Sequence, residues 1–235
     1  MNIYKNYFNE FIELFPSTND YLGLEEYSEF KRYFENSISP EYISNHKHLI
    51  NKYLYLLNNS KDNSINYKIL RYSLLNNLES YKYDFHLIPL NHTDSVLSYF
   101  VELATGKTLY KFKTKKDYIF FIEKSNYFAI YLNQCIINMR NGINKKIVIP
   151  KRICSLLIEQ VKEILIKKSY IKEVVPKSIE NYNTIIENNI VPILKKLLLF
   201  LINEYYPNCQ TKIGLSNLPA PLTRIPSDLL NDNLV

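Results

Sequence analysis

The chain has little glycine, histidine, cysteine or methionine, and no tryptophan. Its 235 residues include 4 Gly, 4 His, 3 Cys and 2 Met. So few glycines argue against collagen-like repeats and Gly-rich phosphate-binding loops. Cys135, Cys154 and Cys209 are odd in number, far apart and without metal-ligand spacing. That pattern favours inert free thiols in a reducing compartment, and we expect a cytoplasmic protein.

The sequence also lacks a long apolar run. The longest, residues 197–202, is far shorter than the roughly 20 residues of a membrane-spanning helix. Residues 1–15 alternate polar with aromatic side chains and carry Glu10 and Glu13. A signal peptide would need an apolar segment there, so we expect neither secretion nor a membrane partner.

Charge of one sign is not strongly in excess. The chain has 29 basic and 23 acidic residues, a net charge of +6. The lysines are spread out, as on solvated helix surfaces, and the densest group precedes a helix start. This group consists of Lys111, Lys113, Lys115 and Lys116. Short basic runs have low specificity. A solvated surface is favoured over an anion site, and nucleic acid is not the expected partner.

Helical periodicity is what the sequence has in abundance. Apolar and aromatic residues, among them 21 Tyr and 12 Phe, recur at i, i+3 and i+4, the spacing of one helix face. Ser39-Pro40 and Thr114 with Asp117 have the composition of helix starts. Gly106 and Gly142 stand where helices are expected to end. The pattern predicts an all-α fold of about eight helices. Their expected ranges are 4–15, 24–35, 39–57, 64–81, 94–104, 114–142, 150–168 and 176–206, and a bend is expected at Pro192 in the last one.

Two features subdivide the C-terminal part. Residues 1–208 are expected to form one helical domain, and residues 209–235, with Pro219, Pro221 and Pro226, a loosely ordered tail. On the last helix the apolar residues cover more than a single stripe, which predicts an interface. The residues assigned to it are Leu194, Leu197, Leu198 and Leu201.

The histidines do not form a metal motif. His46 and His48 are two residues apart, so they face different sides of a helix. A helical zinc pair requires i, i+4 spacing, and the chain has no such His pair. His86 and His92 lie near Asp84 and Asp94 in a loop, a grouping better explained by surface polarity. No catalytic, cofactor-binding or metal-ligating residue is assigned.

Several spaced positions together resemble a large helical family known as a domain of unknown function (number 885), which is similar to zincin metallopeptidases. The matching positions are Phe15-Pro16, Gly23, Pro89-Leu90-Asn91, Met139-Arg140-Asn141-Gly142, Pro150, Gly214-Leu215 and Leu218-Pro219. The chain departs from the family at His92 to Asp94 and at Ala220-Pro221. Members of the family are more than twice this length.

The resemblance implies that this chain is the N-terminal half of a zincin-like hydrolase. The half with the His-Glu-x-x-His motif, and therefore the zinc of full-length members, would be missing, so the chain would be truncated before the metal motif. The half present here would form one wall of a helical scaffold around a deep groove. Arg140 would be a contact for a substrate carboxylate. The alternative for Arg140 is a cation favoured by a helix C-terminus.

Three functional hypotheses follow. In the first, the chain is a non-catalytic part of a metallopeptidase, inactive alone, which assembles with a separately encoded C-terminal half. In the second, it is a free-standing protein-interaction module, as a homo-oligomer or with another chain. The third and weakest is a basic nucleic-acid-binding protein, which a salt-dependent affinity for DNA or RNA would reveal.

Overall fold

The computed structural model describes residues 2–93, 95–106, 111–170 and 175–212, and the described residues form helices without a strand. The all-α prediction is confirmed. None of the helices described combines the length and the apolar character needed to cross a bilayer. The elements are α1 (Ile3–Leu14), α2 (Thr18–Leu22), the 3₁₀ segment η1 (Glu25–Arg32), α3 (Pro40–Asn58), α4 (Ile65–Ser80), η2 (Phe85–Leu87), α5 (Val96–Thr105), α6 (Lys115–Lys145), α7 (Lys151–Lys167), α8 (Tyr182–Phe200), the π segment η3 (Leu201–Tyr205) and α9 (Tyr206–Asn208).

Local chemistry sets several of these boundaries where the sequence predicts them. The Ser39 hydroxyl accepts from the N–H of Tyr42 at 3.1 Å, and Pro40 occupies the first turn of α3. The Asp117 carboxylate accepts from the N–H of Thr114 at 2.7 Å and from its hydroxyl at 2.9 Å at the start of α6. Gly106 follows α5 with a φ of 65°. Asp94, the expected cap of α5, lies outside the described residues.

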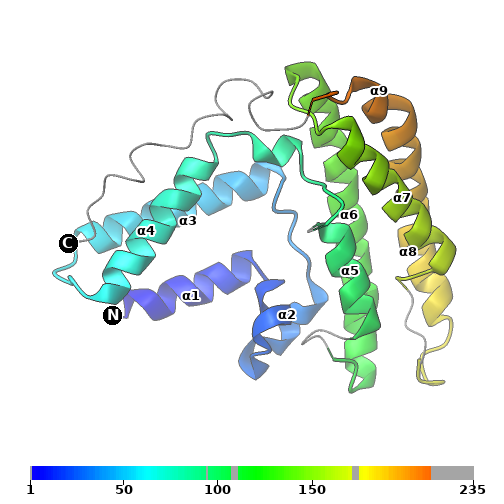
Figure 1. Cartoon of the computed structure of the whole chain (residues 1–235). Coiled ribbons are helices and arrows are strands. Elements are labelled where there is room, and N and C mark those ends of the chain that lie inside the picture. The colour runs from blue at the N-terminus through cyan, green and yellow to red at the C-terminus, as the bar shows by residue number, and fades with distance from the viewer. Residues whose placement is uncertain (1, 94, 107–110, 171–174, 213–235) are drawn as a thin grey trace.

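The long helix α6 is the centre of the molecule. It packs against α8, η1, η2 and η3, while α7 packs on α8 and α9 (Figure 1). Together with α5, these helices enclose the main core, a cluster that includes Phe100, Phe121, Leu132 and Leu197. A separate N-terminal core joins α1, α3 and α4, which lie on the other side in Figure 1. Its buried members are Leu49, Ile50, Tyr53, Leu57 and Leu74. The segment from α2 to α3 therefore links two hydrophobic clusters.

The α-helix expected over residues 24–35 is instead a 3₁₀ segment with a kink. Tyr27 has non-helical angles, φ −109° and ψ 20°. The cause is the buried Asn19 side chain, whose amide nitrogen donates to the carbonyls of Leu24 at 3.2 Å and Tyr27 at 2.9 Å. Its oxygen accepts from the Leu24 N–H at 2.9 Å. These bonds engage backbone groups that would otherwise continue a regular helix.

Gly142 does not end the long helix as expected. The helix α6 continues to Lys145, and Lys146 is the left-handed residue, with a φ of 60°. Glycine at 142 serves close packing instead. A Cβ there would lie 2.5 Å from the carbonyl oxygen of Ile147 and 3.0 Å from that of Leu87.

The last long helix begins later than predicted. It starts at Tyr182 rather than at Pro176, and residues 176–181 form turns. The helix continues through Pro192 to Phe200 and then widens into η3, where the N–H of Tyr206 donates to the carbonyl of Leu201. Residues 209 and 210 remain attached to the domain. Gln210 pairs with the backbone of Ile149 and Lys151, and the buried Cys209 thiol donates to the carbonyl of Tyr205 at 3.3 Å. Residues 213–235, which include most of the expected tail and the family positions after Gly214, lie outside the described residues.

Candidate functional site: an acidic and aromatic groove

A hollow of about 560 Å³ lies where four elements meet. The end of α1, the segment after η1, the start of α3 and the middle of α6 each contribute side chains. Residues that face it include Glu13, Glu35, Glu41, Phe30, Tyr33, Phe34, Asn36, Tyr42, Asn45, Tyr127 and Ile130. Its volume is within the usual range of ligand sites.

A second hollow of about 430 Å³ continues from the first between α1 and α3. The two share Glu13, Leu14 and Asn45, and the second adds Glu10, His48, Leu49 and Lys52. We refer to both together as the groove. It runs from α1 and α3 to the middle of α6 and is open to solvent, so an extended segment fits it better than a compact small molecule.

The larger hollow is acidic, although the whole chain is basic. Glu13, Glu35 and Glu41 line it without any lysine or arginine, whereas the chain has a net charge of +6. Glu13 and Glu41 are exposed. In the second hollow, Lys52 is neutralised by Glu10, with both oxygens 2.7 Å from its ammonium nitrogen. The groove therefore carries an excess of negative charge.

Glu35 is the most enclosed of the three carboxylates. It accepts from the Ser17 N–H at 3.1 Å and from the Ser17 hydroxyl at 2.5 Å. Burial raises the pKa of Glu35, and the two bonds from Ser17 oppose that shift. Its carboxyl group is thus held in place by α2 and presented to the groove.

Tyr42 contributes a hydroxyl group without a protein partner. The side chain is 7% exposed, lines the larger hollow, and its hydroxyl has no hydrogen-bond partner among the described residues. Burial raises the pKa of Tyr42, with a smaller contribution from the nearby Glu35. The hydroxyl therefore remains protonated and able to donate.

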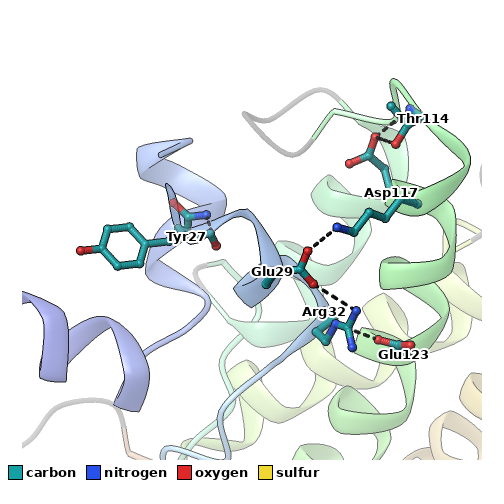
Figure 2. Close-up of polar contacts among 8 residues, drawn as sticks. Tyr27, Glu29, Arg32, Thr114, Asp117 and Glu123 are labelled. Carbon is teal, nitrogen blue, oxygen red and sulfur yellow. Dashed lines mark hydrogen bonds and ion pairs between the residues drawn. The ribbon is translucent and has the colours of Figure 1, made fainter. Parts of the chain in front are cut away.

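Ion pairs fasten η1 to α6 at one side of the groove. Figure 2 shows Glu29 and Arg32 of η1 facing α6, where the Arg32 guanidinium lies 3.3 Å from Glu123. Lys116 also pairs with Glu29. The Arg32 guanidinium stacks over the Phe120 ring at 4.4 Å. These contacts set the position of Phe30, Tyr33 and Phe34, which follow along the same segment.

A buried ion pair joins α2 to α6. Lys124 of α6 and Asp20 of α2 pair with both side chains fully buried. The Tyr99 hydroxyl donates to Asp20 at 2.5 Å. Burial raises the pKa of Asp20, and Lys124 and Tyr99 counteract that shift. This buried pair connects α2 to α6. Ser17, which immediately precedes α2, holds the Glu35 carboxylate through two hydrogen bonds.

Arg140 already has an anion of its own chain. Its guanidinium donates to both oxygens of Glu204, at 2.7 and 2.6 Å, and lies 5.2 Å from the Phe200 ring. It does not line the groove, and α6 extends more than a turn beyond it. The guanidinium that the sequence marks for a substrate carboxylate is thus engaged by Glu204.

The leucines assigned to an interface are mostly interior. Leu194, Leu197 and Leu201 are at most 1% exposed and belong to the main core. Leu198 is partly buried against the same core. The wide apolar surface of this helix is covered by α6 and α7 of the same chain, so three of the four side chains are not available to a partner. The exposed apolar residues nearby are Leu199, Ile202 and Tyr206.

The loop histidines do not assemble into a site. Asp84 pairs with Lys145 at 2.9 Å, and the carbonyl of His86 accepts from Asn138 at 3.0 Å. Within the described part of the chain, no three His, Cys, Asp or Glu side chains come close enough to hold a metal ion.

The groove residues could not be singled out from the sequence. Glu13 lies on the polar side of an aromatic stripe, and Glu41 and Tyr42 follow the Ser39-Pro40 start signal. That signal locates the helix start, but it does not show that the first turn faces α1 and α6. Only the chain path brings the three carboxylates together.

A family model described as "Bacterial protein of unknown function (DUF885)" matches residues 16–222. The chain belongs to the DUF885 family. The match includes every groove residue except those of α1, and no curated protein matches the chain.

Proposed function

We propose that this DUF885 chain is a non-catalytic helical part of a zincin-like metallopeptidase or related hydrolase, and that its groove holds a polypeptide segment. The observation that carries the proposal is the open groove itself, which is lined by aromatic rings, carboxylates and amides from elements far apart in sequence. Extended polypeptides are bound by such surfaces through side-chain pockets and backbone hydrogen bonds. In this proposal, metal-dependent chemistry belongs to a separately encoded polypeptide.

Reconstitution tests this proposal. The purified chain is incubated with zinc and a fluorogenic peptide library, alone and together with a polypeptide, encoded beside it, that carries His-Glu-x-x-His. We expect no hydrolysis by the chain alone and zinc-dependent hydrolysis by the mixture. Hydrolysis by the chain alone would overturn the non-catalytic assignment. A mixture that binds peptides without cleaving them would favour the alternative.

The alternative is a free-standing interaction module. Leu199, Ile202 and Tyr206 favour it, because they are 60%, 41% and 36% exposed and follow one another from the end of α8 through η3 to the start of α9. This surface replaces the buried leucines as the candidate contact for a second copy or another chain. The nucleic-acid hypothesis has less support, because the groove is acidic and would repel phosphates.

A further inference from the structure

The negative charge of the groove favours a positively charged ligand. Glu13 and Glu41 are exposed, and neither pairs with a basic side chain among the described residues. Glu35 lines the same hollow, but Ser17 engages both of its oxygens and burial raises its pKa. In a chain with a net charge of +6, the unpaired carboxylates of Glu13 and Glu41 make a local field in the hollow that attracts positive charge.

The described carboxylates do not form the side-chain cluster that is typical of a site for a small inorganic cation. A divalent ion such as calcium needs six to eight oxygens at roughly 2.3–2.6 Å. No three acidic, histidine or cysteine side chains of the described residues approach closely enough to share one ion. An organic cation does not need such a cluster, because one ammonium or guanidinium group can pair with a single carboxylate while its stem packs on neighbouring side chains.

The aromatic side chains favour an alkylammonium or guanidinium group. Tyr33 and Tyr127 face the hollow, with ring centroids 5.6 Å apart in an edge-to-face arrangement. They are 37% and 38% exposed, so their surfaces are accessible to a ligand. Aromatic faces attract such cations and cover their aliphatic stems.

Tyr42 indicates that the ligand also brings a hydrogen-bond acceptor. Its hydroxyl is buried, protonated and without a partner among the described residues. An unsatisfied buried donor is destabilising, and an incoming carbonyl oxygen would satisfy it. A peptide carries both features, a basic side chain and a backbone carbonyl.

We propose that the groove binds a lysine- or arginine-containing polypeptide segment, with the basic side chain drawn to Glu13 and Glu41 and a backbone carbonyl on Tyr42. This inference rests on the proposed function, in which the groove holds polypeptide, and it specifies the substrate class. Aromatic rings from Tyr33 and Tyr127 cover the stem of the basic side chain.

Three fluorescein-labelled decapeptides of equal length test the proposal by anisotropy, one rich in lysine, one in glutamate and one in glutamine. We expect the lysine peptide to bind at least about tenfold more tightly than the other two, and its affinity to fall as salt rises. The double variant Glu13→Gln/Glu41→Gln should lose about tenfold in affinity for the lysine peptide. Glu102→Gln, an exposed carboxylate outside the groove, is the matched control and should bind as the parent does.

Two further measurements separate the outcomes. Tyr42→Phe removes only the hydroxyl and should weaken lysine-peptide binding about fivefold, the factor for one hydrogen bond of about 1 kcal/mol. Free spermidine should compete poorly, because it has no carbonyl, and competition equal to that of the unlabelled peptide would overturn the polypeptide assignment.

Equal binding of the lysine and glutamine peptides would overturn the charge selection and leave a polypeptide groove. Failure of all three peptides to bind would overturn the groove as a polypeptide site. Thermal denaturation of each variant confirms that it is folded.

Discussion

At the scale of single residues, close backbone packing explains why position 142 is a glycine. Helix propensity alone predicts that Gly142→Ala stabilises α6 by about 1 kcal/mol. The structure predicts the opposite sign, because the added Cβ would lie 2.5 Å from the Ile147 carbonyl and 3.0 Å from that of Leu87. Both obstacles are backbone, so we expect a loss of about 1–3 kcal/mol. Urea denaturation measures it, with Asn141→Ala on the exposed side as control. Stabilisation by Gly142→Ala would contradict the close packing.

His46 makes stability depend on pH. It is 5% exposed, its Nδ1 bonds with the Tyr81 hydroxyl at 2.5 Å, and its Nε2 has no partner among the described residues. Burial lowers the pKa of His46 from 6.5 to about 4. The aromatic rings of Phe15, Tyr42 and Tyr81 pack against it, and the Lys47 ammonium lies over the Tyr81 ring.

The unfolded chain therefore binds a proton at His46 at a higher pH than the folded chain does. The contribution of the neutral imidazole is complete above about pH 6.5 and is lost as pH falls toward 4, by at most about 3 kcal/mol. The free energy of unfolding of the parent should thus decline more steeply over this interval than that of His46→Asn. Parallel pH profiles for the two proteins would show that His46 titrates normally. Burial raises the pKa values of Asp20 and Glu35, which oppose this trend equally in both proteins.

At the scale of elements, one buried ion pair links α2 to α6. Lys124→Met would leave Asp20 buried without its cation, and we expect a loss of about 3–5 kcal/mol. Lys124→Met/Asp20→Asn removes both charges and should be more stable than the single variant. Lys162→Met breaks an exposed pair with Glu159 and should cost less than about 1 kcal/mol. A double variant no more stable than Lys124→Met would show that the loss comes from packing rather than from the unpaired charge.

Two residues at the start of α2 also position side chains of the groove. Asn19 breaks the helix that the sequence predicts after Gly23, and Ser17 holds Glu35. The short α2 therefore determines both the kink in η1 and the placement of a groove carboxylate. A regular helix over residues 24–35 would direct Tyr33 and Phe34 differently, because both residues follow η1 in non-helical backbone, Tyr33 with φ −97° and ψ 153°.

At the scale of the whole molecule, burial decides which residues of the C-terminal helix face a partner. Leu197 is fully buried, so Leu197→Ala should cost about 2–5 kcal/mol of stability. Leu199 is 60% exposed, and Leu199→Asp should leave the stability within about 0.5 kcal/mol. Denaturation measures both changes. Sedimentation velocity on Leu199→Asp tests the interaction module, since any self-association through this surface should be lost. Association that persists unchanged in Leu199→Asp would exclude the surface.

The sequence by itself determined the fold class and most helix starts. Ser39-Pro40, Thr114 with Asp117, and Gly106 act through bonds within one turn, so their effect is legible without the rest of the chain. The spaced residues that resemble the DUF885 family also predicted that the chain belongs to it, which the family model shows.

Only the tertiary structure decided where those helices meet. The groove gathers Glu13, Glu35 and Glu41 from three segments whose proximity depends on the paths of α1, η1 and α3 around α6. Gly142 and the leucines of α8 have the composition of a helix end and an interface, but the close approach of Ile147 and the cover of α6 and α7 give them other roles. Such contacts join residues distant in sequence, and local periodicity carries no information about them.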